Sequence, residues 1–393
     1  MPPNISLRRR LPAALLALAL VHGCTLPVPS PFGAPPGIGG GVSNTHPDGE
    51  SFQRLLDTYA RDGLPGVVLL VRTPEGHWSG AAGYARIESS DPMLPTHRHH
   101  AASMTKMYTA TAVLLLVEDG LIRLDDPITR YLPEFVFGPI PNGALATVRQ
   151  LLSHTSGIPD FNGALGYDLD FFNDPTGVYS PERLLSFLHG QSPIFPPGTG
   201  YFYSNANYLL LALIVDGLQD GGHAEVFTQR IFRPLGLSST FYKNEEGYPS
   251  PPGLVNSYQD LAGDGRLMNV SDLAVNNLTI FAGNAGLVAT AADFAGFIEA
   301  LLEGRLIGKD LLVEMLDWGA RSRYGLGIEF IDTPFGRGIG HSGADFGVLG
   351  QVRHFPDHSA TLVLLANGGD SGKIGQLFWR LWGEAMERAL GGA

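Results

Sequence analysis

Two residues that could do chemistry together are Ser103 and Lys106, which lie three positions apart in the sequence. On a helix, side chains at this spacing share a face, so a hydroxyl and an amine would lie side by side. The residues that follow, 108–117, are apolar almost all round, which is typical of a helix buried in the interior. Burial lowers the pKa of a lysine, and a helix N-terminus stabilises a developing alkoxide. The two residues could therefore supply an activated serine nucleophile.

An isolated Ser-x-x-Lys sequence is more often a helix cap followed by an unrelated lysine. In this chain the match is unusual, because none of the other lysines (Lys243, Lys309 and Lys373) has a serine three positions before it. The catalytic interpretation then depends on partner groups elsewhere in the sequence.

A second motif, Tyr203 and Asn205, follows a loop rich in proline and glycine and precedes another apolar run at 208–215. The phenol could shuttle a proton, and the amide could hold Lys106 or a substrate carbonyl. The same spacing occurs again at Tyr242 and Asn244, where nothing nearby suggests a site. Taken alone, the motif is better explained by a structural tyrosine on a loop.

The third motif is His341-Ser342-Gly343, which lies on a predicted strand. A glycine at this position would let a substrate backbone lie against the strand edge.

The three motifs, in this order along the chain, resemble those of the serine β-lactamase and penicillin-binding superfamily. Tyr-x-Asn as the second motif and histidine at the head of the third are similar to one branch of it. That branch holds D-alanyl-D-alanine carboxypeptidases, class C β-lactamases and β-lactamase-like esterases. The resemblance covers the chain from Phe52 to the C-terminus, and it implies an antiparallel sheet packed by helices beside an all-helical lobe.

The resemblance also implies a role for individual residues. Ser103 would be the nucleophile that becomes acylated, and Lys106 and Tyr203 would act as general base and proton shuttle. Asn205 would orient Lys106 and the substrate amide. The backbone N–H groups of Ser103 and Ala344 would form the oxyanion hole.

By the same resemblance His341, Ser342 and Gly343 would contact the substrate. Many β-lactamases have lysine where this chain has His341, and a neutral imidazole is a poorer anchor for a carboxylate. With a reference pKa near 6.5, His341 would become a cation below about pH 6. Recognition of anionic substrates is therefore expected to depend on pH, and efficient β-lactam hydrolysis is not expected.

The leading hypothesis is an exported serine hydrolase that cleaves ester or D-amino-acid peptide bonds of the D-Ala-D-Ala type. A class C-like β-lactamase is the alternative within the same chemistry. A catalytically silent lipoprotein that binds penicillin or peptidoglycan fragments is the alternative from another class. An α/β-hydrolase is disfavoured because the chain has no Gly-x-Ser-x-Gly sequence.

The elements that would position these residues indicate an α+β fold with an antiparallel sheet flanked by helices. Apolar, β-branched or alternating patterns predict strands at 66–71, 76–84, 324–331, 338–341, 346–355 and 360–366. Helices are predicted at 52–60, 291–303 and 376–389. Between the two groups of strands, residues 120–285 predict an inserted, mostly helical lobe. The hydrolase domain would span 51–393.

The N-terminal residues are typical of an exported protein. Arg8 to Arg10 and the apolar run 11–21 predict a signal peptide over 1–23, too short to span a bilayer permanently. Cys24, the only cysteine, follows a sequence that resembles a lipobox, so it would carry a lipid. Residues 24–50, rich in proline and glycine, would form a tether. The protein is expected in the periplasm or at the cell surface, anchored to the membrane.

Charge and residue spacing argue against two kinds of partner, nucleic acids and metal ions. The formal net charge is −12, and lysine and arginine form no cluster outside the N-terminus, which argues against nucleic acid binding. His97, His99 and His100 cluster before Ser103 but lack the spacing of metal ligands. No metal or other cofactor is expected, and the partner would be a small-molecule or peptide substrate: an ester, a D-amino-acid peptide or a β-lactam.

Overall fold

The computed structural model describes residues 44–175, 177, 179–243, 250–274, 282–319, 322–370 and 372–391. The expected signal peptide, Cys24 and the tether as far as residue 43 lie outside the described residues. By residue 45 the chain already contacts the sheet, because the backbone N–H groups of Thr45 and His46 donate to the carbonyl oxygen of His77. The folded part therefore begins before the expected boundary at residue 51.

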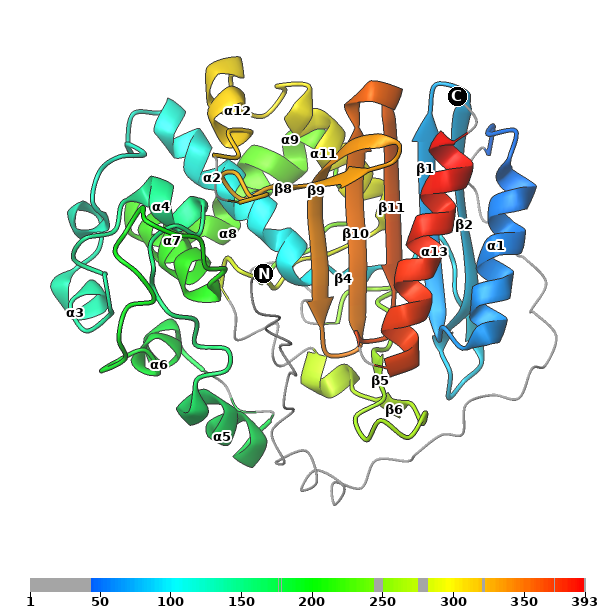
Figure 1. Cartoon of the computed structure of the whole chain (residues 1–393), viewed down its shortest axis with the longest axis horizontal. Coiled ribbons are helices and arrows are strands. Elements are labelled where there is room, and N and C mark those ends of the chain that lie inside the picture. Colours follow the sequence, from blue (N-terminus) through cyan, green and yellow to red (C-terminus); the bar gives the residue numbers. More distant parts are fainter. Residues whose placement is uncertain are drawn as a thin grey trace, which may run out of the picture.

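A seven-stranded sheet forms one side of the molecule (Figure 1). Its order is β3-β2-β1-β11-β10-β9-β8, and all neighbouring strands are antiparallel. The bounds are β1 (Gly66–Thr73), β2 (Gly76–Arg86), β3 (Asp91–Pro92), β8 (Glu329–Thr333), β9 (Gly336–Asp345), β10 (Val348–Phe355) and β11 (Ala360–Ala366). Since β1 pairs with β11, the strands from the two ends of the sequence meet at the centre, and the antiparallel sheet expected from the sequence is confirmed.

Helices cover both faces of the sheet, which explains why β1 reads as one continuous apolar run. Val67, Leu69 and Val71 pack on one face against α1 (Gly49–Asp62) and α13 (Gly372–Leu390). Val68 and Leu70 pack on the other face into the larger core, with α2 (Thr105–Glu118) and α11 (Ala291–Leu302). Figure 1 shows α1 and α13 together on the outer side of the sheet.

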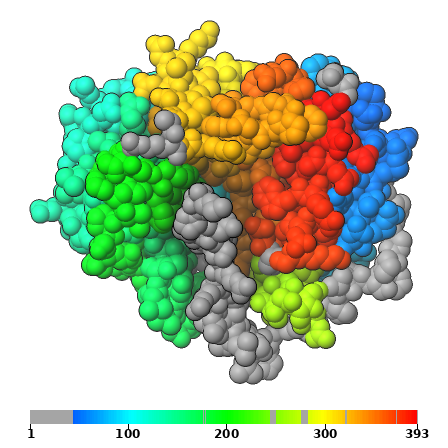
Figure 2. Space-filling model, in the orientation of Figure 1, coloured from blue at the N-terminus to red at the C-terminus, as the bar shows by residue number. Residues whose placement is uncertain are grey.

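A mostly helical lobe lies beside the sheet, as expected for residues 120–285. Figure 2 shows this lobe, in cyan and green, opposite the orange, red and blue of the sheet and the helices that cover it. Its helices include η3 (Ile128–Arg130), α3 (Glu134–Phe137), α4 (Val148–Leu152), α5 (Leu165–Asn173), α6 (Pro181–Ser186), α7 (Asn205–Leu218), α8 (Gly222–Val226), η4 (Phe227–Phe232) and α9 (Arg233–Leu235). The short strand pair β5 (Tyr258–Gln259) and β6 (Met268–Asn269) lies late in this stretch.

The predicted strand at 324–331 is wrong in its first half. The backbone N–H of Gly325 donates to the carbonyl oxygen of Ile328, so these residues form a turn, and β8 begins only at Glu329. Gly327 has a φ of 81°, and a Cβ there would lie 2.2 Å from the Cβ of Ala110. The chain bends here because it passes directly against α2, where only glycine fits.

The described parts of the chain contain no helix long and apolar enough to cross a membrane. They also contain no group of three or more histidine, cysteine or acidic residues that could hold a metal ion. His99 and His100 are instead buried in a short strand, β4 (His99–His100), which pairs with β7 (Val288–Ala289).

Candidate active site

Ser103 stands on a tight turn rather than within a regular helix. The turn is a short 3₁₀ helix, residues 102–104 (η2), that runs directly into α2. Ala102 has a φ of 45°, a left-handed conformation that costs a non-glycine residue about 1–3 kcal/mol. Burial of Met104 and a 2.8 Å hydrogen bond from the N–H of Ala101 to the carbonyl of Leu287 hold the turn in place. The surrounding structure thus fixes the orientation of the serine.

Lys106 is fully buried directly behind Ser103. Its Nζ lies 3.1 Å from Oγ of Ser103, 2.8 Å from Oδ1 of Asn205 and 3.0 Å from the carbonyl oxygen of Asn284. The structure therefore brings the first motif together with Asn205 of the second. It adds Asn284, which no sequence pattern singled out.

The charge state of Lys106 suits proton transfer near neutral pH. Burial lowers the pKa of Lys106 to about 7, although the carboxylates of Asp160, Asp345 and Glu329 act in the opposite direction. A neutral amine has two N–H groups and one lone pair. With its N–H groups donated to the two asparagine oxygens, its lone pair is left to accept the proton of the serine hydroxyl. Lys106 can thus act as a base toward Ser103.

Tyr203 lies on the other side of this amine, with its ring centre 4.8 Å from Nζ of Lys106. Burial raises the pKa of Tyr203 well above its usual value, and a hydrogen bond with Ser103 only partly opposes this. The phenol therefore keeps its proton near pH 7. It can pass a proton between groups, whereas Lys106 is the group that titrates in the working range.

Asn205 is held by Asp160, a residue that the sequence analysis missed. The backbone N–H and the side-chain Nδ2 of Asn205 donate to the two carboxylate oxygens of Asp160, at 3.1 and 2.9 Å. These two hydrogen bonds orient the side chain so that Oδ1 of Asn205 faces Lys106. Burial raises the pKa of Asp160 to about 6, against the opposing effects of its hydrogen bonds and of Lys106.

His154 packs against the second motif and holds it in position. It is fully buried with a φ of 56°, and its ring centre lies 4.3 Å from that of Tyr203. Its Nδ1 accepts a hydrogen bond from the backbone N–H of Ser204 at 3.2 Å and lies 3.1 Å from Nδ2 of Asn207. The sequence analysis assigned no role to His154.

The third motif lies on β9, which runs past the Ser103 turn. β8 pairs with β9 only as far as Gly340, so within the described structure no strand pairs with residues 341–345 on that edge. A Cβ on Gly343 would lie 2.5 Å from the carbonyl oxygen of Ala101. The glycine is therefore needed for close approach of the nucleophile turn to the strand, which the sequence analysis had attributed to the substrate backbone.

His341 is buried and neutral, which corrects the expected pH dependence. Its Nδ1 lies 2.6 Å from the carbonyl oxygen of Ser342, and Tyr324 donates its hydroxyl to Nε2 at 2.9 Å. Burial lowers the pKa of His341 to about 4, although Glu329 opposes this. The ring therefore carries no charge between pH 6 and 8 and cannot act as a cationic anchor in that range.

Ser342 is engaged on the opposite face of β9. Its backbone N–H and its hydroxyl both donate to Oε1 of Glu329 at 2.8 Å, and the buried Arg353 donates to the same oxygen at 2.6 Å. Although burial alone would raise the pKa of Glu329, His341 and Arg353 hold it at about 2. This ionised cluster fixes the strand that carries the motif.

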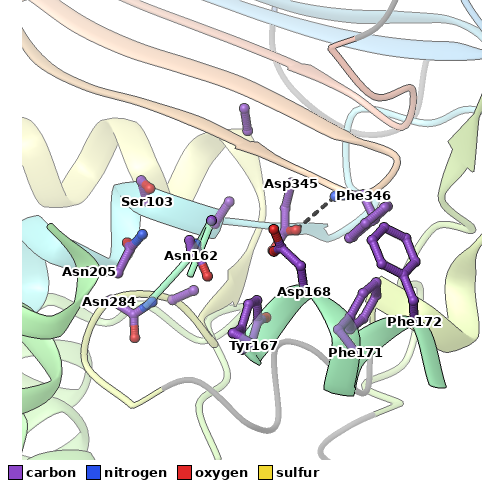
Figure 3. A pocket seen from close by; sticks show the side chains of 14 residues that line it. Ser103, Asn162, Tyr167, Asp168, Phe171, Phe172, Asn205, Asn284, Asp345 and Phe346 are labelled. Atoms are coloured by element: carbon purple, nitrogen blue, oxygen red, sulfur yellow. Dashed lines mark hydrogen bonds between the residues drawn. The ribbon is translucent and has the colours of Figure 1, made fainter. Parts of the chain in front are cut away.

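A cavity of about 280 Å³ opens beside the nucleophile. Ser103, Asn205 and Ala344 line it, together with Asn284 and residues of α5 and of the β9–β10 turn (Figure 3). Ala344, the expected second oxyanion donor, is exposed and lines the cavity together with Ser103. Lys106, Tyr203 and His341 are not among the described lining residues, and the buried Lys106 reaches Oγ of Ser103 from inside the protein.

Comparison with known proteins identifies the family. A family model described as Beta-lactamase matches residues 52–386. The chain is 26% identical to penicillin-binding protein 4* of Bacillus subtilis, over 80% of this chain and 71% of that protein. It is 28% identical to a D-aminopeptidase of Brucella anthropi, over 82% of this chain and 60% of that protein.

Two solved structures are also similar. One is a D-stereospecific amidohydrolase from Streptomyces sp., with a TM-score of 0.74 and 28% identity, covering 84% of this chain and 97% of that one. The other is a D-amino acid amidase from Ochrobactrum anthropi in complex with D-phenylalanine, with a TM-score of 0.74 and 26% identity. That match covers 86% of this chain and 99% of the amidase.

Proposed function

The chain belongs to the β-lactamase family and is a serine hydrolase, and we propose that it hydrolyses amide or ester bonds of D-amino-acid derivatives through an acyl-enzyme on Ser103. The observation that carries the proposal is the contact between Oγ of Ser103 and the buried amine of Lys106. The choice of substrate is supported by relatives described as a D-aminopeptidase, a D-stereospecific amidohydrolase and a D-amino acid amidase.

The site geometry supports the following acylation step. Lys106 in its neutral form takes the proton of Ser103, directly or through the phenol of Tyr203, while Oγ bonds to the substrate carbonyl carbon. The backbone N–H groups of Ser103 and Ala344 donate to the resulting oxyanion, and one such donor is worth about 3–4 kcal/mol. The captured proton then moves to the leaving nitrogen or oxygen, and the carbon–nitrogen or carbon–oxygen bond breaks.

Water completes the cycle. It attacks the ester carbonyl of the acylated Ser103 and gives a proton to the same base. The tetrahedral intermediate collapses, Ser103 recovers its proton, and the free acid leaves. Asn205, held by Asp160, keeps the amine of Lys106 in reach of Oγ through both half-reactions.

The experiment that tests this proposal combines labelling with turnover. Mass spectrometry after treatment with a fluorophosphonate should place the adduct on Ser103, and the parent protein should release ammonia from D-phenylalanine amide faster than from the L-enantiomer. Ser103→Ala should lose both signals. Ser186→Ala, which changes an exposed serine on α6, should keep both. An adduct on another residue, or an active Ser103→Ala protein, would refute the assignment.

Export and lipidation form a separate part of the proposal. The basic triplet, the apolar run 11–21 and Cys24 support a mature protein that starts at Cys24 and is anchored by a lipid in the periplasm or at the cell surface. A Cys24→Ser variant should then leave the membrane fraction while keeping its activity. If it stays in the membrane fraction, the anchor lies elsewhere.

A further inference from the structure

The cavity beside Ser103 has acidic groups and lacks basic ones. Asp168, from α5, and Asp345, at the end of β9, both line it, and none of the described lining residues is lysine or arginine (Figure 3). Within the described part of the chain, neither carboxylate forms an ion pair. Oδ1 of Asp345 accepts a 2.8 Å hydrogen bond from the backbone N–H of Phe346. The cavity thus offers negative charge to whatever enters it.

Asp345 is partly buried at the cavity wall, and burial disfavours its ionised form. Burial raises its pKa to about 6, although the N–H of Phe346 and the amine of Lys106 act in the opposite direction. That amine is engaged with Ser103 and with two asparagines. A partly buried carboxylate with no ion-pair partner in the described structure favours a ligand that brings positive charge.

Asn284 lines the same cavity and has a side-chain oxygen with no hydrogen-bond partner in the described structure. Its side chain is 2% exposed, and its Oδ1 accepts no hydrogen bond within the described structure. Its backbone oxygen is already bound to Lys106, and Figure 3 shows its side chain beside those of Asn205 and Ser103. A buried acceptor without a donor is costly, so the cavity also favours a ligand with N–H groups.

Aromatic side chains form another part of the cavity wall. Tyr167, Phe171, Phe172 and Phe346 line the cavity, and the rings of Phe171 and Phe346 stack at 5.4 Å. Such walls accept an apolar side chain and also attract a cation. A volume of about 280 Å³ lies at the small end of the range for ligand sites, which fits one amino-acid residue rather than an extended peptide.

We propose that this cavity binds the acyl part of the substrate as a single amino-acid residue whose free α-ammonium group pairs with Asp345 and whose apolar side chain packs against the aromatic walls. The inference rests on the proposed function and deepens it. The enzyme would cleave the bond that follows an unblocked amino-terminal residue, as in amino-acid amides, esters and amino-terminal peptide bonds. A substrate with a blocked amine, or with a carboxylate in this position, would be a poor one.

The test compares two substrates that differ only at the amine, D-phenylalanine p-nitroanilide and its N-acetyl derivative, which lacks the charge and carries an added acetyl group. At pH 7 the free amine is mostly protonated and Asp345 is mostly ionised, so the parent enzyme should prefer the free amine in kcat/KM. Asp345→Asn should lower this preference by roughly 10- to 100-fold, because it removes a hydrogen bond between charged groups. The lower kcat/KM for the free amine should result mainly from a higher KM for that substrate.

Two further variants separate binding from general damage. Asp170→Asn makes the same change of charge on α5, but Asp170 pairs with Arg183 and does not line the cavity, so the preference should stay at the parent value. Asp345→Lys should shift the preference toward an acyl group that carries a carboxylate, such as succinyl p-nitroanilide.

Failure of the inference differs from failure of the proposed function. If the parent enzyme cleaves the free and the acetylated substrate equally well, or if Asp345→Asn keeps the parent preference, the cavity does not recognise an ammonium group. The parent comparison needs no variant, so it holds even if Asp345→Asn does not fold. If instead Ser103 forms no adduct and neither substrate is cleaved, the proposed function itself is wrong.

Discussion

Replacing Gly343 by alanine tests the closeness of β9 to the nucleophile turn. The new Cβ would lie 2.5 Å from the carbonyl oxygen of Ala101 and 3.4 Å from Cγ of Met104. An ordinary contact is roughly 3.5 Å, so the strand and the turn have to separate by roughly 1 Å. Both are backbone segments held by other contacts. We therefore expect a loss of about 1–3 kcal/mol in the free energy of unfolding and a loss of roughly 100-fold in kcat/KM.

Gly350→Ala is the matched control on the neighbouring strand. Its Cβ would lie 2.6 Å from Cε of Met104, which is the end of a flexible side chain that can rotate away. Unfolding in denaturant and kcat/KM on a p-nitrophenyl ester would be measured for both variants. We expect the control to stay within roughly tenfold of the parent in kcat/KM. If Gly343→Ala loses no more than this control, the turn and the strand are not in tight contact, and our account of Gly343 is wrong.

Three other predictions follow from buried groups. Lys106 acts as a base only when it is neutral, and its pKa is about 7. The value of kcat/KM on a neutral ester should therefore rise as the pH increases through about 7. A flat profile from pH 5.5 to 9 would contradict this. Asp160→Asn removes a charge that raises this pKa and weakens the hold on Asn205. In this variant the rise of kcat/KM with pH should occur at lower pH than in the parent, and kcat should fall roughly tenfold. A rise at the parent pH would argue against an electrostatic effect of Asp160 on Lys106. The hydroxyl of Tyr108 is buried without a described partner, and its ring stacks on Phe297 at 3.7 Å. In denaturant unfolding, Tyr108→Phe should be at least as stable as the parent, whereas Tyr108→Ala should be less stable by about 3–5 kcal/mol. A destabilised Tyr108→Phe would reveal a partner for the hydroxyl.

Much of the fold was predictable because its signals are local. The sequence patterns at 66–71 and 360–366 indicated the strands β1 and β11, and the all-round apolar pattern of α2 indicated a buried helix that begins near Lys106. The start of β8 was not predictable, because the bend at Gly327 exists only where the chain meets Ala110 of α2.

The candidate site also contains some residues that could be found from the sequence and others that could not. Ser103 and Lys106 could be found because three residues along the chain correspond to one turn of helix. Asp160 and Asn284 could not, because they reach Asn205 and Lys106 across 45 and 178 positions of sequence. Hydrogen bonds over such separations depend on how whole elements pack.

By itself the sequence determined which groups are present and which local elements carry them: a serine and a lysine at the start of a buried helix, and a glycine on a strand. The tertiary structure alone decided their chemical state, because a pKa depends on everything that surrounds a group in space. His341 looked like a titrating cation from its type, yet burial makes it neutral. Lys106 and Asp345 have pKa values of about 7 and about 6 because folding removes water from an amine and from a carboxylate beside Ser103, and no spacing in the sequence encodes that desolvation.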